Sequence, residues 1–445
     1  MVNYTSVLII KHLSQPTMST QKAENVIMDA FCDPDHPIAV DFKKVVAAQK
    51  AIGDAVVKTP CRQSQMSDMF NMEIYFKKEF LQYTGSFKER GARNSLLNLT
   101  PAQKKKGVIA ASAGNHALAL SYHGKCLGIP VSVVMPTVAP LMKIKACEKF
   151  GANITISGNN VCDSRVIALK MGQERGLMYI NGYDHQDIIA GQGTIGLEIV
   201  EQVPDLDACI IPIGGGGMIS GTALAIKTKC PHVKIIGVEP EHSPSFQAAM
   251  KAGKPTFTLT TPTLADGLAV PTVGVNSFET AHKLIDRIVT VNEESIALAI
   301  LRCIELEKAV VEGGGAAGLA AIIQGLVPEL EGKKVVVILS GGNIDTTVLD
   351  RVIERALAED ERLVRFKVSV SDRPGGIAEL TKIVADLGVS IKDIFQERPW
   401  EKHDVFSVMV KVVCETRDAE HSKQLHDAIK KHYPNSHLIW GPSYD

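Results

Sequence analysis

The chain contains 445 residues, with 48 Lys and Arg against 49 Asp and Glu, which gives a formal net charge of −1 at pH 7. Its 45% hydrophobic and 22% charged residues are the balance of a folded, water-soluble protein, which excludes intrinsic disorder over most of the chain. The balanced charge gives no reason to expect nucleic acid or an anionic membrane surface as a partner, and no apolar run approaches the ~20 residues that a membrane span requires.

The first 38 residues are expected to form a flexible extension, which ends in a turn-rich segment, Asp-Pro-Asp-His-Pro, at 33–37. The apolar run Val7–Ile10 is too short for the core of a secretory signal peptide, and the first arginine is Arg62, whereas a mitochondrial presequence is typically rich in Arg. A cryptic targeting role is the alternative. The 9 cysteines are scattered and never form a C-x-x-C pair, which favours a reducing compartment, and we expect the protein to be cytoplasmic.

From about residue 39 to residue 355, short β-branched apolar runs alternate with segments of helical period. Continuous apolar runs indicate parallel strands buried on both faces, so the pattern predicts an α/β protein with one doubly wound sheet or two such sheets. The expected strands are 107–111, 131–135, 208–213, 234–238 and 335–339, and the expected helices include 143–150, 165–175 and 218–229.

The pattern changes after a charged helical stretch at 353–362, which we interpret as a boundary with a linker at 356–362. The elements expected beyond it are a strand at 364–370, a helix at 377–387, strands at 390–396 and 405–413, a helix at 421–433 and a strand at 437–440. This β-α-β-β-α-β order predicts a small ferredoxin-like α+β domain over residues 363–445.

The strongest motif is the glycine run Gly214–Gly217, which lies between an expected strand and an expected helix. Four glycines there allow successive backbone N–H groups to converge on one anion at the positive end of the helix dipole, which favours phosphate binding over a merely flexible loop. Upstream, Gly191-x-Gly193-x-x-Gly196 has the spacing of a dinucleotide fingerprint. No convincing strand precedes it and no strand-borne acid follows it, so NAD binding is disfavoured.

A second motif, TGSFKERG, occupies residues 84–91. Ser86 is expected to cap a helix, which places Lys88 in the first turn, where the helix dipole disfavours its charge. A lysine that is also desolvated there would titrate low enough to act as a nucleophile or base. A single lysine is more often a solvated surface residue, and the motif alone does not decide between the two interpretations.

Two further loops follow expected strands. The segment Ala111-Ser-Ala-Gly-Asn-His116 can present backbone amides and the Ser112 hydroxyl to a carboxylate, while Asn115 can reach a polar ring substituent. Ser340 is the first residue to emerge from the strand 335–339, at the sheet edge where functional groups of α/β proteins gather. A plain turn is the alternative for both loops.

The motifs GSFKERGA, ASAGNHA, IAGQGTIGLE, IGGGGMISG, ADG and LSGGN occur in this order. On these residues the chain resembles pyridoxal-phosphate enzymes of the tryptophan-synthase β-like fold (fold type II), and within them the threonine dehydratase (threonine ammonia-lyase)/serine racemase family, over about residues 39–355. The resemblance implies two open parallel-sheet subdomains, with a small one, about 82–185, inserted in the large one. The segment SVSDRPGGIAELTKIVADLGVSI is similar to ACT regulatory domains.

The resemblance also implies three sets of site residues. The catalytic residue is Lys88, which holds the cofactor and takes the α-proton of the substrate. The residues implied to bind pyridoxal phosphate are Lys88, Phe87, Asn115, Gly214, Gly215, Gly216, Gly217, Met218 and Ser340. The loop implied to grip the substrate carboxylate consists of Ser112, Ala113, Gly114 and His116.

Three positions bear on the reaction. A hydroxyl at Ser340, in place of a carboxylate, leaves the cofactor's ring nitrogen largely neutral, which favours β-elimination of water from a hydroxyamino acid. Related racemases carry a second serine at the position of Ala113, so dehydration is favoured over racemisation. Related racemases also have an acidic cation site, but here only Glu239 is acidic and serines follow it, so we expect no metal.

The resulting expectation is a dehydratase that converts L-threonine to 2-oxobutanoate, L-serine to pyruvate, or both, with release of ammonia. The alternatives are a serine racemase, a β-replacement synthase and a non-catalytic amino-acid sensor. The ACT-like part is expected to bind a small amino-acid effector, for which the turn 372–376 and the helix after it offer an N-terminus; the alternative is that it serves only to dimerise. A homodimer or homotetramer is expected.

Overall fold

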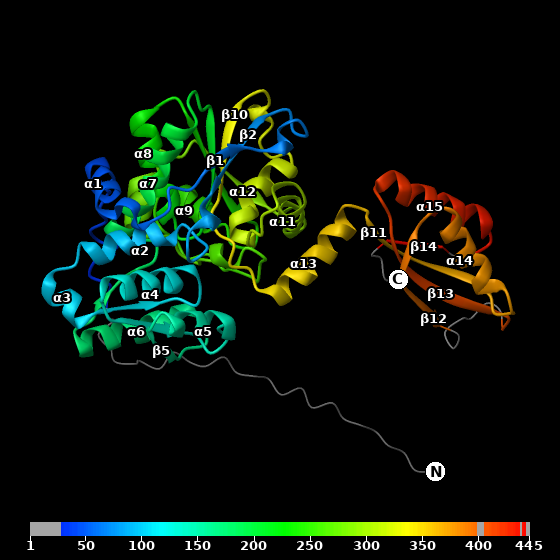
Figure 1. Cartoon of the computed structure of the whole chain (residues 1–445), viewed down its shortest axis with the longest axis horizontal. Coiled ribbons are helices and arrows are strands. Elements are labelled where there is room, and N and C mark those ends of the chain that lie inside the picture. Colours follow the sequence, from blue (N-terminus) through cyan, green and yellow to red (C-terminus); the bar gives the residue numbers. More distant parts are fainter. Residues whose placement is uncertain (1–27, 398–404, 437, 442–445) are drawn as a thin grey trace, which may run out of the picture.

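The computed structural model of the chain describes residues 28–397, 405–436 and 438–441. It confirms the predicted α/β class, with two parallel sheets followed by a small antiparallel α+β unit. Figure 1 shows the two parallel sheets with their helices packed together, and the C-terminal unit beside them at the end of a long helix. None of the helices in the described residues combines the length and the apolar character needed to cross a membrane.

The larger sheet has six strands in the order β1–β2–β10–β7–β8–β9, and all neighbours are parallel except the edge pair β1–β2. Its strands are β1 (Cys61–Gln63), β2 (Glu73–Lys78), β10 (Lys334–Leu339), β7 (Ala208–Pro212), β8 (Lys234–Pro240) and β9 (Arg287–Val291). Alternate residues of β10 face opposite sides: Val335 and Val337 join one hydrophobic core, whereas Val336 and Ile338 join another. Burial on both faces explains why the strands read as continuous apolar runs.

Helices cover both faces of this sheet. The first core is closed by α11 (Glu293–Glu307), α12 (Gly313–Ile323) and α13 (Thr346–Glu359). The second is closed by α7 (Gln186–Gln202), α8 (Gly217–Lys229), α9 (Ser245–Ala252) and α10 (Val275–Ala281). Helices α1 (Phe42–Ile52) and α2 (Lys88–Leu97) pack against α7.

The smaller sheet has four parallel strands in the order β5–β4–β3–β6. They are β5 (Asn153–Ile156), β4 (Val131–Met135), β3 (Val108–Ala111) and β6 (Met178–Tyr179), and the helices of this part are α3 (Pro101–Lys106), α4 (Asn115–Leu127), α5 (Leu141–Lys149) and α6 (Val161–Arg175). Side chains of α2, α4 and α5 join the core on one face of this sheet, and side chains of α6 join the core on the other.

The C-terminal unit is a four-stranded antiparallel sheet in the order β12–β13–β11–β14. Its elements are β11 (Leu363–Ser371), α14 (Gly376–Asp386), β12 (Ser390–Glu397), β13 (Ser407–Glu415), α15 (Ala419–His432) and β14 (Ile439–Trp440), which is the predicted β-α-β-β-α-β order. The predicted linker at 356–362 coincides with the last turn of α13 and three residues after it, and Ala356 is buried in the core of the large sheet.

Two expectations differ from the structure. Ser86 does not cap α2: the helix begins at Lys88 after Phe87, because Ser86 is held in an antiparallel bridge with Gly341. Of the expected flexible extension, residues 1–27 lie outside the described residues, whereas the remainder packs on the protein. Cys32 is buried there, and the backbone of Ile38 donates a hydrogen bond to Asn276 Oδ1 at 2.7 Å.

The segment with the dinucleotide spacing forms buried turns of α7 rather than a loop. A Cβ on Gly191 would lie 2.6 Å from the carbonyl oxygen of Arg90, and one on Gly193 would lie 2.9 Å from that of Gly221. These glycines therefore allow α7 to approach α2 and α8 closely, a packing role that accounts for them without a nucleotide.

Candidate active site

The loops singled out in the sequence meet at the carboxyl ends of β3, β7 and β10. The N–H of Phe87 donates to the carbonyl oxygen of Ser340 at 3.0 Å, and the N–H of Gly342 donates to the carbonyl of Gly85 at 2.9 Å. These bonds and the Ser86–Gly341 bridge join the start of α2 to the loop after β10, about 250 residues apart in sequence. The start of α2 is thus fixed by the end of a central strand.

Lys88 is the first residue of α2 and is half-buried. Its Nζ donates to the carbonyl oxygen of Gly182 at 2.6 Å and lies 5.1 Å from the centre of the Phe87 ring. Desolvation lowers the pKa of the Lys88 ammonium to about 8, an effect that the negative charge of Glu312 partly opposes. Near pH 8 about half of Lys88 is therefore an uncharged amine, the form that can act as a nucleophile or base.

The glycine run Gly214–Gly217 forms a tight cradle at the start of α8. A Cβ on Gly215 would lie 2.3 Å from the Tyr183 ring, and one on Gly217 would lie 2.3 Å from the Tyr183 carbonyl oxygen. Gly216, with φ +97°, adopts the left-handed conformation as N-cap, and no side chain caps the first turn. Met218 is buried in the core beneath the loop. These glycines therefore pack closely against Tyr183, and they leave the first turn of α8 with backbone amides that no side chain within the described residues caps, the kind of group that can bind an anion.

A carboxylate that sequence reasoning missed lies beside Asn115. Glu312 Oε1 accepts a hydrogen bond from Asn115 Nδ2 at 2.6 Å, and Asn115 Oδ1 accepts one from Asn343 Nδ2 at 2.8 Å. Burial, reinforced by the charge of Asp266, raises the pKa of Glu312 to about 7, and the hydrogen bond from Asn115 opposes this shift. The available signal was an acid directly before a second glycine run, Gly313–Gly315, at the start of α12.

Hydroxyl groups also gather at the Ser340 end of the site. Ser340 is 3% exposed, and within the described residues its hydroxyl makes only a long hydrogen bond, 3.4 Å, to the carbonyl of Gly314. The buried hydroxyls of Thr84 and Ser86 have no hydrogen-bond partner in the described part of the chain. Because buried polar groups are nearly always hydrogen-bonded, these hydroxyls indicate a place for a bound polar group.

The loop after β3 presents backbone rather than charge. Gly114 is the N-cap of α4, no side chain caps this helix, and Ser112 Oγ accepts from the Gly114 amide at 3.2 Å. Ala113 offers no acid–base group. His116 is buried, with Nε2 at 3.1 Å from the carbonyl oxygen of Ile180. Desolvation, with the nearby charge of Lys88, lowers the pKa of His116 to about 3, so its ring is neutral and supplies no cation.

The segment 181–184 is a second part of the site that sequence reasoning missed. The carbonyl oxygen of Gly182 accepts the hydrogen bond from Lys88 Nζ. A Cβ at Gly182 would lie 2.7 Å from the His116 ring. Asp184 anchors the segment by accepting from the amides of Val275 and Ser277 at 3.0 and 2.9 Å. Tight anchoring of this segment keeps the acceptor for Lys88 fixed.

A cavity of about 380 Å³ adjoins the Glu312 and Asn343 end of the site. Lys143 of α5 and Asp266, from the large-sheet part, form an ion pair of 3.5 Å at this cavity. The pair links the two sheet units across the cavity wall.

Glu239, considered above for a cation, has both carboxylate oxygens engaged. They accept from the amides of Phe246 and Gln247 at 2.7 and 2.9 Å, in the first turn of α9. Burial raises the pKa of Glu239 to about 7. Its role in the structure is to cap a helix.

The comparisons with known proteins agree with this geometry. The family described as "Pyridoxal-phosphate dependent enzyme" matches residues 52–341, and the ACT domain family matches residues 364–430. The chain is 40% identical over 387 residues to L-threonine ammonia-lyase of Thermotoga maritima, covering 87% of this chain and 96% of the relative. It is 40% identical over 320 residues to the catabolic L-threonine dehydratase of Escherichia coli, covering 72% of this chain and 97% of the relative.

Two solved structures share the fold of the catalytic part. The processed form of threonine deaminase isoform 2 from Solanum lycopersicum matches with TM-score 0.68 and 35% identity, over 72% of this chain and 96% of that one. Serine racemase from Dictyostelium discoideum matches with TM-score 0.65 and 36% identity, over 69% of this chain and 99% of that one.

Proposed function

The chain belongs to the family of pyridoxal-phosphate-dependent enzymes and carries an ACT domain, and on this premise we propose that it is an ammonia-lyase that acts on L-threonine, on L-serine or on both. The reaction removes water from the hydroxyamino acid and yields 2-oxobutanoate or pyruvate together with ammonia. The observation that carries the proposal is the placement of Lys88, with its lowered pKa, beside the Ser340 loop and bonded to Gly182, which precedes the Tyr183 that the glycine run packs against.

The site fits pyridoxal phosphate. Lys88 would hold it covalently, the amides of Gly214–Gly217 with Met218 would bind its phosphate, and Phe87 would lie against its ring. Asn115 would bond the ring hydroxyl and Ser340 the ring nitrogen; each has a hydrogen-bonding group within the described site. When bound, the cofactor supplies a conjugated ring that accepts the electrons released as the Cα–H bond of the substrate breaks.

The start of α4 would orient the substrate by binding its carboxylate. The uncapped amides after Gly114, the Ser112 hydroxyl and the backbone of Ala113 would receive the substrate carboxylate, because a helix N-terminus attracts anions. The neutral His116 would contribute through its backbone and by packing against Gly182, rather than through charge.

Lys88 is the residue that would transfer the protons. Once the substrate has displaced Lys88 from the cofactor, the freed amine would take the α-proton. The Cβ–O bond would then break, and the proton on Lys88 would pass to the departing hydroxide, which leaves as water. The resulting enamine leaves the site, takes a proton at Cβ and is hydrolysed to the 2-oxo acid and ammonia. Hydrogen bonding to the Gly182 carbonyl keeps Nζ positioned for this transfer.

Serine racemase is the second candidate, since a serine racemase shares the fold at 36% identity. Racemisation needs a second acid–base group on the face of the substrate opposite Lys88. The residue at that point of the loop is Ala113, which has none. This favours elimination.

We also propose the organisation around this site. Residues 39–355 form the catalytic domain, with the smaller sheet, about 82–185, inserted in the larger, and 363–445 form an ACT domain that binds a small amino-acid effector. The protein acts in the cytoplasm as a homodimer or homotetramer.

The test is to incubate the purified protein and pyridoxal phosphate with L-threonine and with L-serine and to measure 2-oxo acid, ammonia and D-serine in the same samples. We expect equal amounts of 2-oxo acid and ammonia, with little D-serine. If D-serine were the main product, the protein would be assigned as a serine racemase rather than an ammonia-lyase. Neither product from a protein that binds the cofactor would favour a β-replacement enzyme or a sensor.

A further inference from the structure

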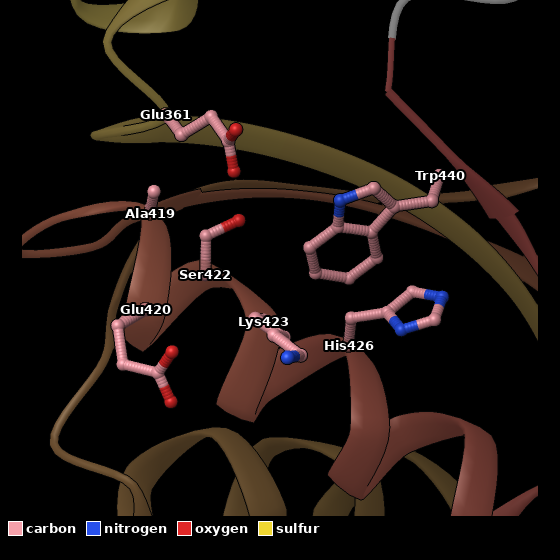
Figure 2. Close-up of a pocket in the computed structure, with 7 residues that line it drawn as sticks. All are labelled: Glu361, Ala419, Glu420, Ser422, Lys423, His426 and Trp440. Atoms are coloured by element: carbon pink, nitrogen blue, oxygen red, sulfur yellow. The ribbon is translucent and has the colours of Figure 1, made fainter.

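Glu312 is a buried carboxylate at the edge of the active site, and the reaction proposed above assigns it no role. It lines the cavity of about 380 Å³ together with Asn343. Carboxylates elsewhere differ from it: Glu361 and Glu420, which border a hollow of about 470 Å³ beside α15 and β14, are exposed to solvent (Figure 2). Because burial of a carboxylate costs free energy, a buried one is normally held by specific partners.

A series of hydrogen bonds between Thr84 and Glu312 fixes the orientation of two amide side chains. The carbonyl oxygen of Thr84 can only accept, and it accepts from Asn343 Nδ2 at 2.8 Å. The same nitrogen donates to Asn115 at 2.8 Å, so the Asn115 atom at that end is its oxygen. The other end of the Asn115 amide is therefore its nitrogen, which donates to Glu312 Oε1 at 2.6 Å.

Two glycines allow these side chains to lie where they do. The N–H of Glu312 donates to the carbonyl oxygen of Gly341 at 3.0 Å, and a Cβ on Gly341 would lie 2.3 Å from Glu312 Oε1. A Cβ on Gly85 would lie 2.6 Å from Asn343 Oδ1. Gly85 belongs to the TGSFKERG motif and Gly341 to the LSGGN motif. Both motifs therefore contribute space for the groups that hold Asn115.

Asn115 retains one N–H that no group within the described residues accepts. A primary amide has two N–H bonds, and Glu312 accepts one of them, while Asn343 donates to the amide oxygen. Toward a bound molecule, Asn115 therefore presents a donor. A donor stabilises an oxygen that carries negative charge, such as an ionised ring hydroxyl.

Charged groups surround Glu312. They are Lys88, Lys143, Asp266, Glu293 and Asp345. Burial, reinforced by the charge of Asp266, raises the pKa of Glu312 to about 7, so both of its forms are populated at neutral pH. A carboxyl group keeps an oxygen that accepts a hydrogen bond in either form. The orientation of Asn115 is therefore maintained while Glu312 titrates.

We propose that Glu312 is a positioning residue for the cofactor, and that its carboxyl oxygen holds the Asn115 amide so that the remaining N–H binds the ring hydroxyl oxygen. Glu312 acts through Asn115 in this role. The inference rests on the proposed function in one respect, the binding of pyridoxal phosphate with its ring hydroxyl at Asn115.

The test compares Glu312→Met with Glu312→Gln in the full-length protein. Both variants lack the charge, but only glutamine keeps an oxygen that can accept from Asn115. Two quantities are measured: the Kd of pyridoxal phosphate by absorbance titration, and the ratio of the bands of the bound cofactor with an ionised and a neutral ring oxygen. One oriented hydrogen bond is equivalent to a factor of about ten. We therefore expect Glu312→Met to bind about tenfold more weakly than Glu312→Gln, with less of the ionised form.

Glu293→Met and Glu293→Gln form the control pair. Glu293 is also buried and lines the same cavity, but it accepts from Thr263 and Leu264 instead of Asn115. We expect the two control variants to agree within about twofold in both measurements. Equal values for Glu312→Met and Glu312→Gln would overturn the proposal. A difference of the same size in the control pair would also overturn it, because general loosening of the cavity would then explain the result.

Urea unfolding establishes that each variant is folded. If Glu312→Met does not fold, Glu312→Leu, which also lacks an acceptor, replaces it with the same expectation. Release of 2-oxobutanoate from L-threonine by the wild type separates this proposal from the proposed function. An active wild type with equal Glu312 variants keeps the ammonia-lyase and loses the positioning role. A wild type that binds the cofactor without releasing 2-oxo acid loses the ammonia-lyase, and a tenfold difference between the variants still supports the positioning role.

Discussion

Replacement of the buried carboxyl of Glu312 by the amide in Glu312→Gln should change the pH dependence of stability. Glu312 is 7% exposed, and its pKa is raised to about 7 from an ordinary value of 4.5. The folded state thus favours the protonated form. The stability from this group is fully present below pH 4.5 and is lost as the pH rises to about 7. At about 1.4 kcal/mol for each tenfold change in the protonation equilibrium, the loss above pH 7 amounts to about 3 kcal/mol.

The amide of glutamine does not titrate and still presents an oxygen to Asn115. We therefore expect Glu312→Gln to match the wild type near pH 5 and to exceed it in free energy of unfolding at pH 8, by up to about 3 kcal/mol. The assay is urea unfolding of the cofactor-free proteins at pH 5, 6, 7 and 8. Glu331→Gln, at an exposed glutamate, is the control and should show no pH-dependent difference. A difference between Glu312→Gln and wild type that stays constant across this range would refute the reasoning.

Three further predictions concern the site and its support. Lys88→Ala should abolish 2-oxo acid release while urea unfolding stays close to wild type, since the side chain makes a single hydrogen bond; retained activity would contradict the assignment of the base. Gly215→Ala should weaken pyridoxal-phosphate binding, measured by absorbance titration, because its Cβ would lie 2.3 Å from the Tyr183 ring; unchanged affinity would mean that the cradle can relax. Arg90→Met should lower the free energy of unfolding by about 3–5 kcal/mol, because it removes the ion-pair partner of buried Glu79 and leaves Glu198 paired with Lys77 alone; a loss below about 1 kcal/mol would show that the two glutamates protonate or rehydrate at little cost.

Most elements of the fold could be predicted from local pattern. The strand predicted at 131–135 is β4, and the helix predicted at 218–229 is α8 with one residue added at its start. Both predictions depend on the spacing of apolar side chains, which the chain carries in itself. The glycine run Gly214–Gly217 could be singled out in the same way, because it lies directly before a predicted helix, whereas the role predicted for Lys88 depended on the resemblance to a known family.

Long-range contacts account for what was missed or misjudged. The dinucleotide-like glycines became helix-packing positions only once α7 lay against α2 and α8. Ser86 was predicted to cap α2, but in the folded chain it is held in an antiparallel bridge with Gly341. In both cases a local motif admits several conformations, and a partner far along the chain selects one.

The sequence by itself determined the order of strands and helices, because each element follows from residues within a few positions of one another. It also led to the predictions of an anion cradle at Gly214–Gly217 and of a catalytic role for Lys88, the second of which depends on the resemblance of several motifs along the chain. Only the tertiary structure placed Glu312 against Asn115, 197 residues away, and directed Lys88 to the Gly182 carbonyl, 94 residues away. It also lowered the pKa of Lys88 and raised that of Glu312. These pKa shifts arise from desolvation and from charges that folding brings together, and neither is present in the linear order of the residues.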